Sequence, residues 1–221
     1  MCHGEHGSVG REQARRGSRA RPGVFIVSML MAMLAGVWPV PAAYQQDDRG
    51  FDPTGTWFGM HGPLVLMRAG DTLSFSYSAV FGATAHLCDG AGVAGFAGGG
   101  TWTYTDGQGT VSITTRDGGV TMTVTDGIAS FCGAYWPGDR FERAGWKPAF
   151  SCEVSATRAA FYVVGPVPPA KRPAYVVTGD RVEAADLVHD RAAPWVLARF
   201  VGRTATTAGL LARTDLACRP E

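Results

Sequence analysis

Short segments of alternating apolar and polar residues run through the middle of the chain. Leu73-Ser-Phe-Ser-Tyr77 and Val120-Thr-Met-Thr-Val124 place a large apolar side chain at every second position, with serine or threonine between them. A period of two is typical of a strand with one buried face and one face in water. Asp-Gly pairs, such as Asp106-Gly107 and Asp126-Gly127, separate these segments, and they are a strong signal for hairpin turns.

The spacing predicts an antiparallel β-barrel or β-sandwich over residues 54–141. The expected strands are 56–59, 64–68, 72–80, 84–88, 101–105, 110–116 and 120–125, with a candidate eighth at 129–132. The tract Gly90–Gly100 holds six glycines in eleven residues. Because glycine weakens the interior of a strand, we expect a mobile loop there.

A second group of apolar segments follows, which makes the whole chain all-β in expectation. Residues 142–151 are expected to form a linker, and residues 152–218 a second small domain. Its expected strands lie at Ala159–Val164, Ala174–Glu183 and Trp195–Val201, with a stiff proline-rich loop after the first of them.

The amino-terminal residues carry a targeting signal. Five arginines precede residue 24, an apolar run of fifteen residues extends from Val24 to Trp38, and small residues follow at Ala42 and Ala43. This pattern predicts a secretory signal peptide over residues 1–42, cleaved after Ala42 or alternatively after Ala43. An uncut membrane anchor is the alternative, although a bilayer span needs about twenty residues. The expected location is therefore the periplasm or the extracellular space.

The cysteine count agrees with export. Four cysteines follow the signal (Cys88, Cys132, Cys152 and Cys218), and an even number in an exported chain predicts two disulfides with three possible pairings. We favour Cys88 with Cys132 and Cys152 with Cys218, because each pair then brackets one structural unit. A zinc site is the alternative, but such sites use closely spaced cysteine pairs that this sequence lacks.

Charge restricts the class of partner. From Ala43 onward the chain has 15 Lys and Arg against 17 Asp and Glu, so the formal charge is 15 − 17 = −2. Nucleic acid is therefore not an expected partner. A membrane contact is expected only through the signal segment if it stays uncut. The sequence carries no cofactor motif and no metal-ligand spacing around His61, His86 or His189, so no cofactor and no metal are expected.

Two resemblances bear on fold and function. Phe81-Gly-Ala-Thr-Ala-His-Leu-Cys88 followed by Phe131-Cys132-Gly-Ala134 resembles small exported bacterial envelope proteins, some described as lysozyme inhibitors, although this chain lacks the further cysteine that members often carry between the two. That resemblance implies a non-enzymatic envelope protein that binds cell-wall material or inhibits a lytic enzyme such as lysozyme. Gly55-Thr56-Trp57 is similar to the G-x-W opening of lipocalins, which implies the alternative of a carrier for a small apolar ligand.

The second domain resembles a bacterial SH3-like barrel. The residues that carry this resemblance are Tyr175, Gly179-Asp180, Val182, Trp195, Gly209, Leu211 and Leu216. The sequence departs from the family at Gly209-Leu210, where Gly-Trp is usual, so one groove aromatic is replaced. Tyr162, Tyr175 and Trp195, with Tyr135 and Trp136 in the first domain, are the expected ligand contacts because loop aromatics stack on sugars and grip peptides.

Catalytic chemistry has only weak candidates in this sequence. His86 lies two residues from Cys88, the spacing that puts both on one face of a strand, but a disulfide cysteine beside an ordinary histidine is the favoured interpretation. Asp139 and Glu142 could form a carboxylate pair, although two solvated charges are the simpler interpretation. We therefore expect no catalytic residue.

Overall fold

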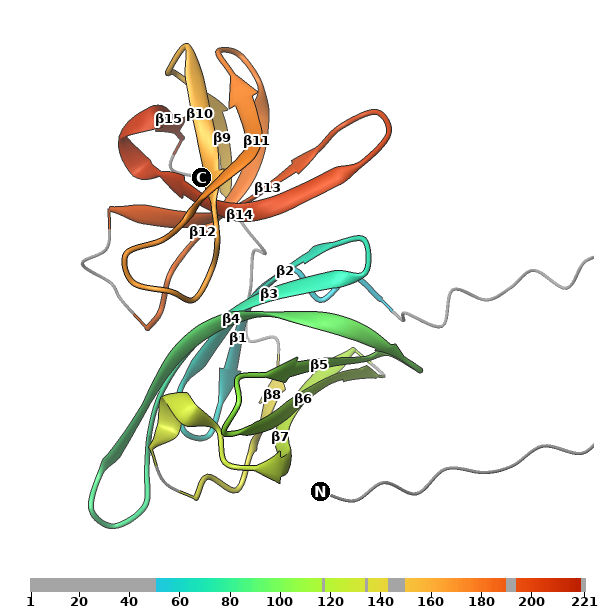
Figure 1. The fold of residues 1–221 in the computed structure, drawn as a ribbon, viewed down its shortest axis with the longest axis vertical. Helices are drawn as coiled ribbons and strands as arrows, with labels where there is room; N and C mark the ends of the chain where they lie inside the picture. Colours follow the sequence, from blue (N-terminus) through green and yellow to red (C-terminus); the bar gives the residue numbers. More distant parts are fainter. Residues whose placement is uncertain (1–50, 117, 134, 143–149, 190–193, 220–221) are drawn as a thin grey trace, which may run out of the picture. The chain divides into compact units, whose positions relative to one another are not determined.

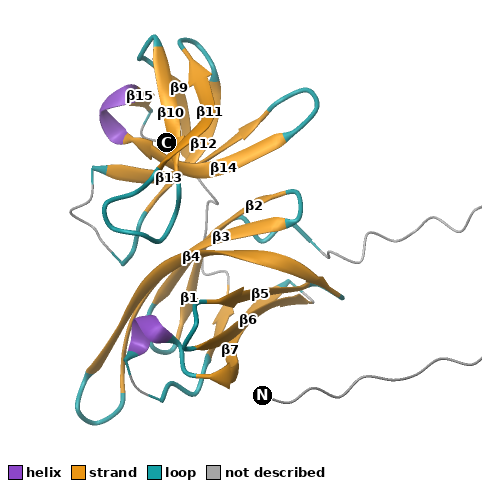
Figure 2. Cartoon of the chain, viewed as in Figure 1, coloured by secondary structure: helices purple, strands orange, loops and turns teal. Residues whose placement is uncertain are grey.

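The computed structural model describes residues 51–116, 118–133, 135–142, 150–189 and 194–219. These residues form β-strands in two sheets (Figures 1 and 2), which confirms the all-β class. The predicted signal peptide lies outside the described ranges. No helix within them is long and apolar enough to cross a bilayer.

The first sheet is a closed barrel, so of the two expected architectures the barrel is the one observed. Every strand is antiparallel to its neighbour, and β1 closes the barrel on β8 by pairing Phe58 with Glu142 and Gly59 with Phe141. The strands are β1 (Gly55–Gly59), β2 (Pro63–Ala69), β3 (Thr72–Phe81), β4 (His86–Gly98), β5 (Thr101–Thr105), β6 (Gly109–Arg116), β7 (Gly119–Gly127) and β8 (Asp139–Glu142).

The loop expected at Gly90–Gly100 is a strand, and that prediction is wrong. β4 runs from His86 to Gly98 and pairs with β3 along ten residues. The glycines make room for aromatic rings: a Cβ at Gly92 would lie 2.6 Å from Tyr104 Cε2, and one at Gly90 would lie 2.4 Å from Phe131. Within this tract, positive φ occurs only from Gly98 to Gly100, at the end of β4 and in the turn that follows.

The candidate strand at 129–132 is instead a turn of 3-10 helix, η1 (Ser130–Cys132). Its last residue forms the predicted disulfide with Cys88 of β4. The segment is followed by Gly133 in the left-handed conformation, with φ of 61°, which ends the helix where a strand would have continued. The disulfide therefore joins the end of a short helix to the long strand β4.

The second sheet is curled into a half-barrel and has seven strands in the order β11-β10-β14-β13-β12-β9-β15. The strands are β9 (Phe150–Val154), β10 (Arg158–Tyr162), β11 (Lys171–Val177), β12 (Arg181–Asp186), β13 (Trp195–Val201), β14 (Thr206–Ala212) and β15 (Leu216–Cys218), with a second 3-10 turn, η2 (Arg213–Asp215). Cys152 and Cys218 lie directly opposite each other on β9 and β15 and form the second predicted disulfide.

Three clusters of buried side chains stabilise the two sheets. The barrel interior is filled by large residues that include Trp57, Phe75, Tyr77, Trp102, Trp136 and Phe141. The second sheet has its own core around Phe161, Val182 and Val196. A third cluster joins Val65 and Met67 from the outer face of β2 to Val164, Leu187, Leu197 and Leu210 of the second sheet.

That third cluster corrects the expectation that the serine positions of β3 face water. Ser74 is 2% exposed and Ser76 is fully buried, although both point away from the barrel interior. They lie on the outer face, the face on which Val65 and Met67 of neighbouring β2 are also buried. Alternation located the interior of the barrel, but it did not show that part of the exterior is covered as well.

Candidate functional site

The cysteine and histidine proposed as a nucleophile pair cannot act as one in this arrangement. Cys88 is buried and bonded to Cys132, so it has no free thiol. His86 is exposed at the start of β4, where its ring lies 5.7 Å from that of Phe81. All four cysteines of the described ranges are in disulfides, and a disulfide sulfur is not a nucleophile.

The two carboxylates after Trp136 do not face one cleft. Asp139 and Glu142 lie three apart on β8, so they point to opposite sides: Asp139 is 7% exposed and Glu142 is exposed. The Asp139 carboxylate accepts hydrogen bonds from the backbone N–H groups of Met60 (3.1 Å), His61 (3.1 Å) and Arg140 (2.9 Å). It therefore organises the β1–β2 turn.

Tyr77 completes this cluster from the barrel interior. Its hydroxyl donates to Asp139 Oδ2 at 3.3 Å. Burial, reinforced by the adjacent Asp139 carboxylate, raises the pKa of Tyr77, so the phenol keeps its proton and acts as a donor. Gly59 makes the close approach possible, since a Cβ there would lie 2.3 Å from Asp139 Oδ2.

His61 lies beside Asp139. Among the contacts between described residues, this is the one that joins a histidine to a carboxylate. The His61 Nδ1 is 3.4 Å from Asp139 Oδ2. No group of three or more metal-ligating side chains occurs among the residues that the structure describes. The cluster is thus one carboxylate, one imidazole and one phenol around the β1–β2 turn, and its hydrogen bonds fix that turn.

The five predicted ligand aromatics separate into three environments. Tyr135 is 80% exposed, and Tyr175 is 51% exposed beneath the Arg158 guanidinium, 3.8 Å from the ring centroid. Trp136 is buried in the barrel core, 2% exposed and 5.3 Å from the ring of Tyr77, so the expectation that it is exposed is wrong. Only Tyr162 and Trp195 come together, with ring centroids 4.6 Å apart.

Trp195 lines a recess of about 100 Å³ in the second sheet. Its walls are apolar and include three prolines from two separate segments: Val164, Gly165, Pro166, Val167, Pro169, Leu187, His189, Pro194, Trp195 and Leu210. Val167 at the rim is 91% exposed. We call this the Trp195 recess; it is a mostly apolar hollow beside an aromatic pair, and His189 is the one ionisable residue among its described walls.

Hydrogen bonds to Ser76 of the barrel position Val188 and His189, the segment that forms one wall of the Trp195 recess. Ser76 Oγ accepts from the backbone N–H groups of Val188 (3.0 Å) and His189 (3.3 Å) and lies 2.6 Å from His189 Nδ1. Because the oxygen already accepts two N–H groups, its single proton is directed at Nδ1, which places the imidazole proton on Nε2. The buried serine of β3 therefore fixes both the position and the tautomer of this histidine.

Leu210 occupies the position where SH3-like families usually have tryptophan. It is 4% exposed, packs between the two sheets and forms one wall of the Trp195 recess. The preceding Gly209 is needed for close packing, because a Cβ there would lie 2.8 Å from the Tyr162 carbonyl oxygen. The aromatic surface is thus supplied by Trp195 from the adjacent strand β13, whose Leu197 is paired with Leu210.

Sequence reasoning found Tyr162 and Trp195 but not the polar groups around them. Ser76 and Arg172 gave no signal, because a serine in a strand and an Arg-Pro dipeptide are ordinary features of a sequence.

Comparison with protein-family models, with curated proteins and with solved structures finds no match to this chain.

Proposed function

We propose that this protein is an exported, envelope-associated binding protein without catalytic activity. Cell-wall material or a lytic enzyme such as lysozyme is its expected partner. The observation that carries the proposal is the Trp195 recess, where Tyr162 and Trp195 pack together beside a wall of prolines and valines. Aromatic and proline surfaces of this kind bind sugars and extended peptides through stacking and apolar contact.

Two further features support the proposal, one for the compartment and one for a role in binding. Both disulfides are compatible with an oxidising compartment. The strongest hydrogen-bonding groups, such as the Asp139 carboxylate, are occupied by the protein's own backbone. A carrier of an apolar ligand in the barrel is not favoured, because Trp57, Phe75 and Tyr77 fill the interior; such a ligand would have to displace buried rings.

The test is retention on purified peptidoglycan, with lysozyme inhibition measured in parallel. We expect Trp195→Ala to lose retention or inhibition by about thirtyfold, because an anchor aromatic contributes on the order of 2 kcal/mol to a binding site. Trp195→Phe should retain most of it. Leu87→Ala is the control, since Leu87 is exposed on β4 and does not line the recess. Wild-type protein that neither binds peptidoglycan nor inhibits lysozyme would contradict the proposal.

A further inference from the structure

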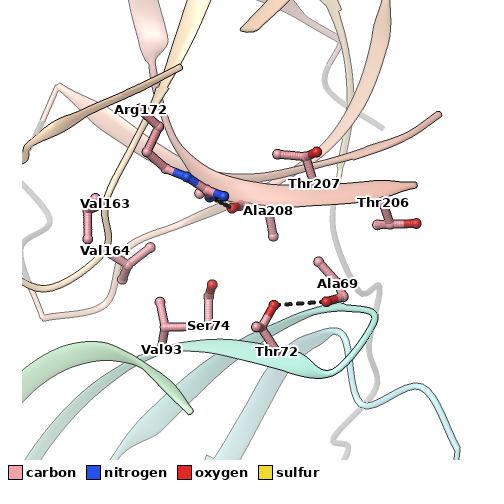
Figure 3. Close-up of a pocket in the computed structure, with 11 residues that line it drawn as sticks. Ala69, Thr72, Ser74, Val93, Val163, Val164, Arg172, Thr206, Thr207 and Ala208 are labelled. Atoms are coloured by element: carbon pink, nitrogen blue, oxygen red, sulfur yellow. Dashed lines mark hydrogen bonds between the residues drawn. The ribbon is translucent and has the colours of Figure 1, made fainter. Parts of the chain in front are cut away.

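A second recess lies where β3 and β4 of the barrel face β14 and the segments flanking β10 and β11 (Figure 3). Its volume is about 190 Å³. The residues that line it are Ala69, Thr72, Ser74, Val93, Val163, Val164, Arg172, Thr206, Thr207, Ala208 and Gly209. We call it the Arg172 recess. It shares only Val164 with the Trp195 recess, so the two are lined by different sets of side chains.

Among the described residues of this lining, Arg172 is the only ionisable one. Its Nη1 donates to the Ala208 carbonyl oxygen, which anchors the guanidinium over the recess (Figure 3). No carboxylate forms an ion pair with Arg172 within the part of the chain that the structure describes. Arg199, by contrast, is paired with Asp52 and Glu183, and Arg213 with Asp186. A guanidinium has five N–H donors, so Arg172 presents a positive charge and free donors to the recess.

Ser74 supplies a hydroxyl on the opposite wall. Only 2% of the residue is exposed, and its hydroxyl points into the recess (Figure 3). It makes no hydrogen bond to another described residue. The Ser74 oxygen is not among the fully buried atoms that lack a partner, so it reaches the recess and is available to a polar ligand that also pairs with the guanidinium. Thr72, by contrast, donates to the Ala69 carbonyl oxygen at 2.8 Å.

The remaining walls define the rest of the ligand. Ala69, Val93, Val163 and Val164 are apolar and surround the polar pair. The volume of about 190 Å³ leaves room for a small molecule of several heavy atoms. One cation, four hydroxyl-bearing residues (Thr72, Ser74, Thr206 and Thr207) and apolar alanine and valine side chains match a monoanion with a short aliphatic part better than a dianion.

We infer that the Arg172 recess is a binding site for a small monocarboxylate with a short aliphatic chain. The carboxylate accepts hydrogen bonds from the Arg172 guanidinium and from the Ser74 hydroxyl, and the aliphatic part contacts Val93, Val163 and Val164. Guanidinium and carboxylate are planar groups whose donors and acceptors match in pairs. The inference is independent of the proposed envelope function, because it uses none of the aromatic residues of the Trp195 recess.

The experiment uses butyrate and its neutral isostere butyramide, titrated into purified protein with both disulfides formed and followed by ligand-observed NMR. We expect wild-type protein to bind butyrate at least about tenfold more tightly than butyramide, because only the carboxylate forms a charge-assisted pair with Arg172. Arg172→Gln should weaken butyrate binding by about tenfold or more, and Ser74→Ala by a smaller factor. Arg158→Gln is the matched control, since Arg158 stacks on Tyr175 away from this lining.

Equal binding of butyrate and butyramide by the wild-type protein would overturn the assignment, as would an unchanged butyrate affinity in Arg172→Gln. Absence of butyrate binding at millimolar concentration would also overturn it. The comparison of the two ligands on wild-type protein needs no variant, so the test survives if a substitution disturbs folding. Butyrate binding that persists in Trp195→Ala, with peptidoglycan retention lost, would separate this site from the proposed function.

Discussion

At the scale of single residues, Asp139 shows how a polar side chain can be buried without being catalytic. Its carboxylate satisfies three backbone N–H groups and the Tyr77 hydroxyl. Removing one partner of such a network leaves the others unsatisfied, which costs more than the hydrogen bonds themselves contribute. The same residue therefore looks like a catalytic candidate in the sequence and acts as a structural organiser in the fold.

We predict that Asp139→Ala lowers the free energy of unfolding by about 2–4 kcal/mol, because it strands the buried donors of the β1–β2 turn. Tyr77→Phe should cost about 1 kcal/mol, since it removes one donor and leaves the carboxylate with its backbone partners. Glu142→Gln on the exposed side of β8 should change stability by less than about 0.5 kcal/mol. Urea unfolding measures all three, and a loss in Glu142→Gln equal to that in Asp139→Ala would contradict the assignment.

At the scale of elements, β4 shows where residue propensities predict the wrong structure. Short apolar segments and Asp-Gly turns were sufficient to place β2, β3, β5, β6 and β7 within a few residues, although β2 and part of β3 are buried on both faces. The glycines of β4 look like a loop until the rings that fill the space are known. The rings that fill this space are those of Tyr104, on the neighbouring strand β5, and of Phe131, in η1. No single-segment pattern contains this information.

The glycines of β4 make a matched test. A Cβ at Gly92 would lie 2.6 Å from Tyr104 Cε2 and 3.0 Å from Phe75 Cε1, whereas one at Gly95 would meet nothing within 4 Å. We expect Gly92→Ala to destabilise the protein by about 1–3 kcal/mol through overpacking. Gly95→Ala should be neutral or stabilising by up to about 1 kcal/mol, because it restricts the unfolded chain.

Thermal unfolding of the two glycine variants, compared with wild type, would check this prediction. If both variants were equally destabilised, the cost would come from glycine flexibility along β4 and not from contact with the aromatic rings. If neither were destabilised, the rings would have room to move aside, and the account of why β4 is rich in glycine would fail.

At the scale of the whole molecule, the sequence indicated two disulfide-bonded β-units but not the contacts between them. Each cysteine pair could be assigned because it brackets one group of strands. The contacts of Ser74, Ser76 and Arg172 could not be foreseen, because each depends on which outer face of the barrel meets the second sheet. The unbroken apolar run Leu64-Val-Leu-Met67 is the one trace of that burial, since a strand covered on both faces loses its alternation.

Arg199 of β13 is the main charged link between the sheets. Its Nη1 donates to Asp52 Oδ2 (2.7 Å), Thr54 Oγ1 (2.8 Å) and the Arg68 carbonyl oxygen (3.2 Å), and its Nε donates to Glu183 Oε2 (2.7 Å). Burial opposes ionisation of Asp52, but hydrogen bonds from Thr54 and Arg199 outweigh it, so the pKa of Asp52 is lowered. A carboxylate with a lowered folded-state pKa stabilises the fold above its unfolded-state pKa of about 3.9.

The contribution of Asp52 is therefore present at neutral pH and is lost as the pH falls below about 4 through the lower folded-state value. Because the Asp52 side chain is 48% exposed, we expect the contribution to be at most about 1 kcal/mol and to shrink at high salt. Urea midpoints at pH 7 and pH 3 measure it: Asp52→Asn should lose stability at pH 7 relative to wild type, and the difference should narrow at pH 3. Glu153→Gln, on the exposed side of β9, is the control. A gap between Asp52→Asn and wild type that is as wide at pH 3 as at pH 7 would mean that Asp52 acts through its shape and not through its charge, because the other ion pair of Arg199, with Glu183, lies within the second sheet.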